Sequence, residues 1–159
     1  MKTPASIARH PIHPMLVAVP IGLWTFSLAC DVIYALGGRA ETWQTAALLS
    51  LVGGLVGALL AAVPGFVDML SLRGYLKRVA LAHMAINLVV VGLYLVNAWL
   101  RSTEAPATTT TGLSAAGIAL LLVSGWLGGK MVYVHGVAVA SDAAPAPRAA
   151  TRRHALPHA

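Results

Sequence analysis

The sequence is short of charge and of cysteine. Aspartate, glutamate, lysine and arginine make up only 10% of its 159 residues, whereas an average soluble domain is about 25% charged. Because 58% of the residues are hydrophobic, this deficit indicates a membrane protein, and the length allows one domain. The single cysteine, Cys30, excludes an intramolecular disulfide framework.

Catalytic signatures are missing as well. There is no glycine-rich phosphate loop, no His-Glu-x-x-His pair and no Cys-x-x-Cys pair, so the known motifs give no ground for an enzymatic activity. The formal net charge of +6 does not indicate a nucleic-acid partner. The basic residues stand at the ends of apolar runs, where a membrane protein needs them for its orientation.

Four apolar stretches are long enough to cross a lipid bilayer as helices. A hydrocarbon core of about 30 Å needs about 20 helical residues, and none of the stretches alternates apolar and polar residues as a transmembrane strand does. The predicted spans cover about residues 14–36, 45–68, 79–100 and 112–134.

The predicted fold is therefore all-α: a polytopic membrane protein built as a bundle of four transmembrane helices. The bundle occupies residues 1–140. Residues 141–159 consist largely of Ala, Pro and Arg and have almost nothing to bury, so we predict a disordered tail there.

Lysine and arginine are unevenly shared between the two sides of this bundle. Four spans place both ends of the chain on one side, and that side holds nine of the 11 Lys and Arg residues. The other side holds only Arg39 and Arg101. The positive-inside rule then predicts that both termini are cytoplasmic.

Glycines at helical spacing predict two contact faces. Gly53 and Gly57 lie four residues apart in the second span, and the fourth span contains Gly125, Gly128 and Gly129. Small residues at this spacing let helix backbones approach closely in lipid. The faces serve either the interior of the bundle or a homo-oligomer.

Two prolines lie inside predicted spans. Pro20 cannot donate a hydrogen bond to the carbonyl of Leu16, and Pro64 cannot donate to that of Leu60. We predict a kink at each position.

Four ionisable residues, one from each predicted helix, are expected at a similar height in the membrane. They are His13, Asp68, His83 and His135. Counting about 1.5 Å per residue from the opposite face puts them at roughly 35, 35, 27 and 33 Å. Ionisable residues at membrane depth are functional candidates, so we expect the four to converge. His10 and Lys130 can join them, and Asn87 lies one turn beyond His83 on the same face.

Imidazole and carboxylate together suit a transition metal ion. Two histidines on facing helices could instead ligate a b-type haem inside the bundle. In either case His10, Asn87 and Lys130 would surround the ligands. A purely structural interpretation is also open, because imidazoles at helix ends can cap backbone groups and Asp68 can pair with Arg73.

Asp31 lies near the other end of the first span, away from these residues. We expect it to pair with Arg39 or Arg101, the two basic residues on that side.

Several runs of the sequence are similar to a known family. They are His-Pro-Ile-His-Pro-Met-Leu-Val at 10–17, Val-Pro-Gly-Phe-Val-Asp at 63–68, His-Met-Ala-Ile-Asn-Leu at 83–88, Gly-Trp-Leu-Gly-Gly at 125–129 and Tyr-Val-His-Gly-Val at 133–137. Over about residues 9–139 the chain resembles an uncharacterised prokaryotic membrane-protein family, domain of unknown function 2231.

The resemblance implies a fold and a location in the inner membrane of a bacterium, but no activity. Many relatives carry a further histidine where this chain has Ala18, and some carry histidine or an acid where it has Lys130. Some are fused to a Rieske-type iron–sulfur domain, which implies redox work with a partner.

The leading functional hypothesis is a non-enzymatic membrane protein that binds a metal ion or haem and serves electron transfer. A second hypothesis is a small transporter or channel component with His83 and Asn87 in a polar path. A third is a structural membrane protein without a ligand.

Overall fold

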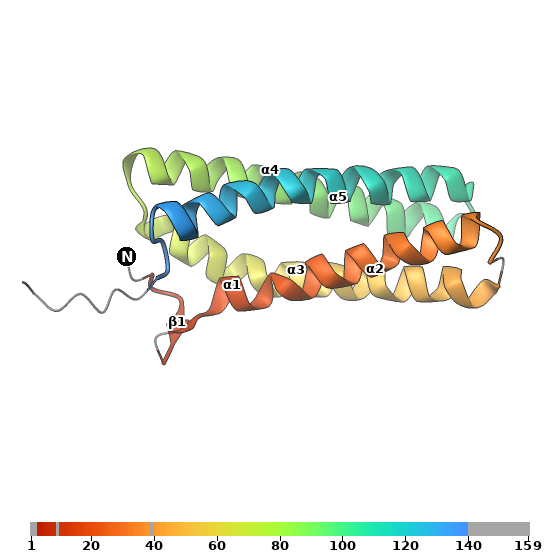
Figure 1. Ribbon diagram of the computed structural model, residues 1–159, viewed down its shortest axis with the longest axis horizontal. Coiled ribbons are helices and arrows are strands. Elements are labelled where there is room, and N and C mark those ends of the chain that lie inside the picture. Colours follow the sequence, from red (N-terminus) through yellow and green to blue (C-terminus); the bar gives the residue numbers. More distant parts are fainter. Residues whose placement is uncertain (1–2, 9, 39, 140–159) are drawn as a thin grey trace, which may run out of the picture.

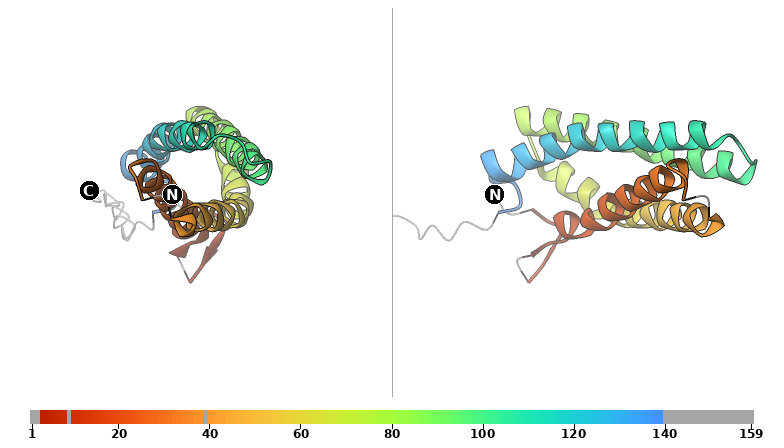
Figure 2. Two further views of the ribbon diagram at one scale, coloured as in Figure 1. Left: turned by 90° about the vertical axis from the view of Figure 1, so that its right-hand side faces the viewer. Right: turned by 45° about the vertical axis from the view of Figure 1, so that its right-hand side comes forward.

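The computed structural model describes residues 3–8, 10–38 and 40–139. Four long helical rods run side by side in an elongated antiparallel bundle (Figure 1) and surround its axis when the bundle is viewed end-on (Figure 2). The elements in chain order are β1 Ser6–Ile7, β2 His10–Pro11, α1 Ile12–Leu16, α2 Ala18–Ala35, α3 Glu41–Ser71, α4 Gly74–Ser102, α5 Ala107–Gly129 and the π-helix η1 Lys130–Val134.

The four predicted spans are confirmed. In the described part of the chain, four helical stretches are long and apolar enough to cross a membrane, and they cover Ile12–Ala35, Glu41–Ser71, Gly74–Ser102 and Ala107–Val134. Large apolar side chains such as Val56, Leu88 and Leu122 point outward and are exposed. A soluble bundle would cover such a surface with polar groups, so the outer face is the one that contacts lipid.

The two ends of the bundle differ in composition. The histidine end is formed by α1, the link between α3 and α4, and η1, and the N-terminal segment lies beside it (Figure 1). The arginine end is formed by the links between α2 and α3 and between α4 and α5, and it carries Arg101.

A short β-hairpin precedes the bundle at the histidine end, and the sequence did not lead us to expect it. β1 and β2 pair in antiparallel fashion with Ser6 opposite Pro11 and Ile7 opposite His10. Ala8 in the connecting turn has a φ of 48°. The hairpin projects sideways from the bundle (Figures 1 and 2).

The two span prolines act differently. The first rod is interrupted at Val17, between α1 and α2. The helix α1 ends at Leu16, and Pro20, which has no backbone N–H, cannot donate a hydrogen bond to the Leu16 carbonyl. In contrast, α3 continues as one helix through Pro64. A break in the helix thus lies one turn before Pro20, while at Pro64 the helix is unbroken. The kinks expected at both prolines stay predictions.

The middle of the bundle holds an apolar cluster of Trp24, Leu51, Leu55, Val90 and Tyr94. The rings of Trp24 and Tyr94 stack with centroids 4.2 Å apart and planes 6° apart, an arrangement worth about 0.5–1.5 kcal/mol beyond its buried area. The indole also donates to the carbonyl of Leu51 at 3.1 Å. We call this group the central cluster.

A second apolar cluster closes the histidine end. Its buried members are Met69, Leu72, Ala80, Met131 and Val137. They come from α3, the link that follows it, α4, η1 and the segment after η1, so this terminal cluster joins the ends of three rods. The level between the two clusters carries the candidate site.

Candidate functional site

The His13 ring lies in a seat formed by α3. Its Nδ1 is 2.8 Å from the carbonyl oxygen of Ala61, and because a carbonyl only accepts, Nδ1 donates. A Cβ atom on Gly65 would lie only 2.6 Å from that nitrogen. Gly65 therefore makes room for the ring, next to the turn in which Pro64 leaves the Leu60 carbonyl without its helical donor.

The His83 ring lies in a comparable seat formed by α5. Its Nδ1 is 3.0 Å from the carbonyl oxygen of Ser124 and 2.9 Å from the hydroxyl oxygen. A Cβ atom on Gly128 would come within 3.2 Å of the ring. Asn87 links His83 to α5, because its amide donates to the Ser124 hydroxyl at 2.6 Å and to the His83 carbonyl at 2.8 Å.

The two rings face each other across the bundle. Their centroids are 6.3 Å apart and their planes are nearly perpendicular, at 89°. In the neutral rings Nδ1 carries the proton, so each Nε2 carries a free lone pair. Two imidazoles from α1 and α4 thus offer one unprotonated nitrogen each, between the central and terminal clusters.

Asp68 and His135, also predicted at this site, lie in other contacts. Asp68 is buried and accepts a hydrogen bond from the backbone N–H of Ala5 at 2.8 Å. The exposed His135 packs its ring edge against Tyr75, with centroids 5.7 Å apart. Within residues 3–8, 10–38 and 40–139, no three His, Cys, Asp or Glu side chains come together to hold a metal ion.

The expected convergence of four ligands is therefore reduced to a pair. Depth in the membrane fixed the height of each side chain, but the angle around the helix and the path of the N-terminal segment decide the contacts. Of the residues expected to surround the site, Asn87 does so through Ser124. His10 bonds instead to the carbonyl of Ala8 at 2.9 Å, and the Lys130 ammonium lies 5.9 Å from the centre of the Tyr75 ring.

The predicted contact glycines are distributed over several neighbours. A Cβ on Gly53 would lie 3.2 Å from Leu23, and one on Gly57 would lie 2.9 Å from Val19, so both glycines face α2. Gly128 faces His83. Gly125 faces open space, and a Cβ on Gly129 would meet only Tyr133, at 3.9 Å.

Two serines of the polar network were missed from the sequence. Ser114 and Ser124 lie on the same stripe of α5 as Gly117 and Gly128, and the steps of three, seven and four residues follow a heptad pattern. A Cβ on Gly117 would lie 2.7 Å from the ring of Tyr94. Small residues at heptad spacing, with two hydroxyls among them, were the signal that could have revealed the α4–α5 face.

The arginine end holds a second buried polar group, centred on Asp31. Arg101 donates to Asp31 at 2.5 Å and to Asn97 at 3.1 Å. Ser114 donates to the same carboxylate at 3.2 Å, and Asn97 donates to Ser114 at 2.9 Å. The pairing of Asp31 with Arg101, one of the two expected alternatives, is present.

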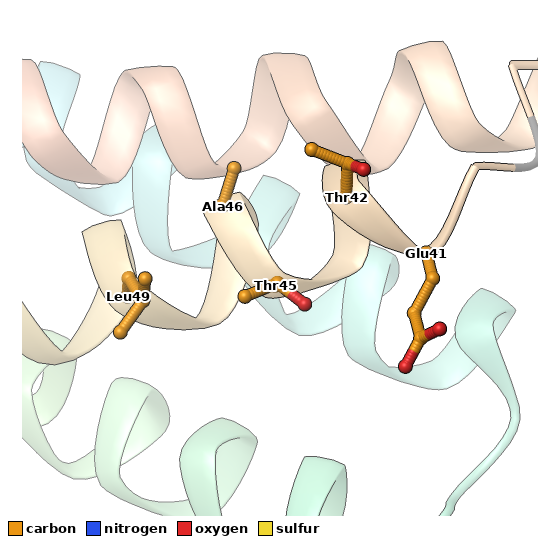
Figure 3. Close-up of a pocket in the computed structure, with 5 residues that line it drawn as sticks. All are labelled: Glu41, Thr42, Thr45, Ala46 and Leu49. Atoms are coloured by element: carbon orange, nitrogen blue, oxygen red, sulfur yellow. The ribbon is translucent and has the colours of Figure 1, made fainter.

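A shallow hollow at the arginine end has a volume of about 400 Å³ and is lined by Glu41, Thr42, Thr45, Ala46 and Leu49. All five residues belong to the first turns of α3 (Figure 3). Residues from a single helix face make an open surface feature, and the hollow lies at the end of the bundle opposite to the histidine pair.

The comparison with known protein families agrees with this architecture. A family model described as "Predicted membrane protein (DUF2231)" matches residues 9–141. The chain belongs to this family. The part that matches the DUF2231 family contains all four spans and both facing histidines. No curated protein and no solved structure matches the chain, so the DUF2231 assignment carries a membrane location and no activity.

Proposed function

We propose that this membrane protein binds a transition-metal centre between His13 and His83 and uses it for one-electron transfer. The observation that carries the proposal is the facing pair of imidazoles, each held by a backbone carbonyl at Nδ1. Histidine ligands of metals almost always donate their other ring N–H to a carbonyl or carboxylate, which fixes the tautomer and the ring orientation.

The spacing of the rings supports a shared metal. A metal–nitrogen bond is about 2.0–2.1 Å long, and the centre of the ring lies beyond the nitrogen. Two imidazoles on opposite sides of one metal therefore have centroids roughly 6 Å apart. The separation in the structure is 6.3 Å. Both a single ion and a haem iron accept two imidazoles.

The surroundings favour electron transfer over transport. The central cluster lies between the histidine pair and the Asp31–Arg101 group and includes the fully buried Leu51 and Val90. An apolar layer of this kind interrupts a polar path along the bundle, whereas an electron needs no such path. The centre would take one electron from a redox protein and pass it to another, returning to its first oxidation state.

We further propose that the protein lies in the inner membrane of a bacterium with the histidine end toward the cytoplasm. The excess of Lys and Arg on the side of that end supports this orientation. The redox partners would then reach the centre from the cytoplasmic side.

Purification in detergent, metal analysis and an absorption spectrum test the proposal. We expect about one metal per chain, with a Soret band if the metal is haem iron and none if it is a single ion. His13→Ala and His83→Ala should each remove the metal. His135→Ala and His10→Ala are matched controls, because these rings lie in other contacts, and both should keep it.

Failure of metal binding would decide against the proposal. If the wild-type protein carries no metal and takes up neither haem nor added Cu, Zn, Fe or Ni, the histidine pair has a structural role. If the His135 control loses the metal and the His83 variant keeps it, the site has been placed wrongly.

A further inference from the structure

Two buried methionines follow the two histidine seats by about one helical turn along the chain. Met69 follows Gly65, the seat of His13, by four residues, and Met131 follows Gly128, the seat of His83, by three. Both side chains are almost fully buried, with 7% and 9% of their surface exposed, and both belong to the terminal cluster. The two glycines and the two methionines thus come from the same two rods.

The direction of the helices favours an orientation of these thioethers toward the rings. A helical side chain leans toward the N-terminus of its helix and covers the preceding turn. The rods that carry Met69 and Met131 both run from the arginine end to the histidine end. By this rule the side chain of Met69 covers the turn that contains Gly65. Met131 is the second residue of η1, directly after the α-helical turn that contains Gly128, and the same lean would bring its sulfur over that turn.

We propose that the metal is a single copper ion, Cu(I) in the reduced state of the centre and Cu(II) after it gives up its electron, bound by Nε2 of His13 and His83 and by the sulfurs of Met69 and Met131. This inference rests on the proposed function and names its metal. Thioethers are soft ligands that select Cu(I), and imidazole also suits copper. Zinc favours cysteine, histidine and carboxylate, and the nearby carboxylate of Asp68 is bonded to the Ala5 amide.

The charge of the site points to the same ion. Two imidazoles and two thioethers are neutral, so the bound ion brings its full charge into the membrane. The Born cost of burying a charge rises with the square of that charge. A monovalent ion is therefore buried at about a quarter of the cost of a divalent ion of the same size.

Leucine substitutions separate a ligand from a packing residue. Leucine matches methionine in volume and is well tolerated in cores, but it has no sulfur. We expect the double variant Met69→Leu/Met131→Leu to lose at least about 10-fold in Cu(I) affinity, measured by competition with a chromogenic Cu(I) chelator. Met15→Leu is the matched control, because Met15 is 63% exposed, and it should bind Cu(I) like the wild type.

X-ray absorption at the copper edge provides the second readout. We expect sulfur as well as nitrogen neighbours around copper in the wild type, and nitrogen only in the double variant. The wild-type spectrum decides the matter even if the double variant does not fold. The methionine assignment is overturned if Cu(I) has no sulfur neighbour, or if the folded double variant binds it as tightly as the wild type.

The outcomes also separate this inference from the proposed function. Loss of haem in His13→Ala and His83→Ala, without selectivity for Cu(I), would leave the histidine centre in place and remove the methionines from it. A zinc ion at the pair would contradict both proposals, because zinc has no redox chemistry. Absence of every metal from the wild type would remove both.

Discussion

Two glycines decide where the histidine rings can lie. The imidazole of His13 occupies the volume that a side chain at position 65 would fill, and the ring of His83 lies against position 128. In both cases the ring also bonds to a carbonyl of the same helix, at Ala61 or Ser124. Each seat thus combines a missing side chain with an accepting carbonyl, and this combination sets the direction of each Nε2.

Adding one methyl group at position 65 should therefore disturb the site. The Cβ of Gly65→Ala would lie 2.6 Å from Nδ1 of His13, so the ring must shift. Overpacking of this kind costs about 1–3 kcal/mol. We expect a lower melting temperature in detergent and loss of the bound metal.

Gly125→Ala provides the control for this substitution. Nothing lies within 4 Å of the added Cβ, and replacing a helical glycine by alanine gains roughly 0.5–1 kcal/mol. Equal melting temperatures for the two variants would show that Gly65 does not shape the seat.

The histidine pair could be predicted from the sequence, but the rest of the site could not. Helical rise alone placed His13 and His83 at similar heights in the bundle. It could not show that Asp68 meets the Ala5 amide, because nothing in the composition indicates that the N-terminal segment turns back along α3. The angle of His135 depends on the π-helical turn before it, and a period of 3.6 residues does not predict such a turn.

At the scale of elements, the helices join in pairs along distinct faces. α2 packs along α3, and α4 packs along α5. The α2–α3 face is close because Gly54 admits the Trp24 ring, whose nitrogen would lie 2.4 Å from an added Cβ. The α4–α5 face depends on the small residues of α5. The ion pair of Asp31 and Arg101 connects the α2–α3 helix pair to the α4–α5 helix pair, since it joins α2 to α4.

This ion pair should behave as a buried unit. The exposed fractions of the Arg101 and Asp31 side chains are 9% and 6%. Asp31→Asn leaves the guanidinium buried without a counter-charge, which costs about 3–5 kcal/mol. We expect the double variant Asp31→Asn/Arg101→Gln to recover much of that loss. Thermal unfolding of the four proteins in a double-mutant cycle measures the coupling.

Additive losses in that cycle would contradict the prediction. They would mean that Asn97 and Ser114 compensate each charge separately, through their bonds to Arg101 and Asp31.

At the scale of the whole molecule, bilayer thickness made the fold predictable. A span of about 20 apolar residues is a strong signal, so all four rods were found. Their ends were less well placed: α3 begins at Glu41 and ends at Ser71, whereas we predicted about 45–68. Polar end turns extend beyond the hydrocarbon layer, where hydropathy gives no boundary. The β-hairpin is too short to have a periodic pattern, and the predicted tail at residues 141–159 lies outside the described residues.

Orientation is the remaining property of the whole molecule that the charges predict. Arg101 is neutralised by Asp31. Arg39 is the other basic residue of the sequence on that side, against nine on the side of the histidine end. The positive-inside rule depends on such flanking charges. We therefore expect the histidine end in the cytoplasm and the link between α4 and α5 outside.

Cysteine labelling in intact cells tests this orientation. The native Cys30 is buried, with 0% of its surface exposed, so a single added cysteine reports its own position. Glu104→Cys, in the exposed link between α4 and α5, should react with a membrane-impermeant maleimide. Ser71→Cys, at the exposed end of α3, should react only after the cells are permeabilised. The reverse pattern would place the histidine end outside, and the redox partners of the proposed centre would then have to approach from that side.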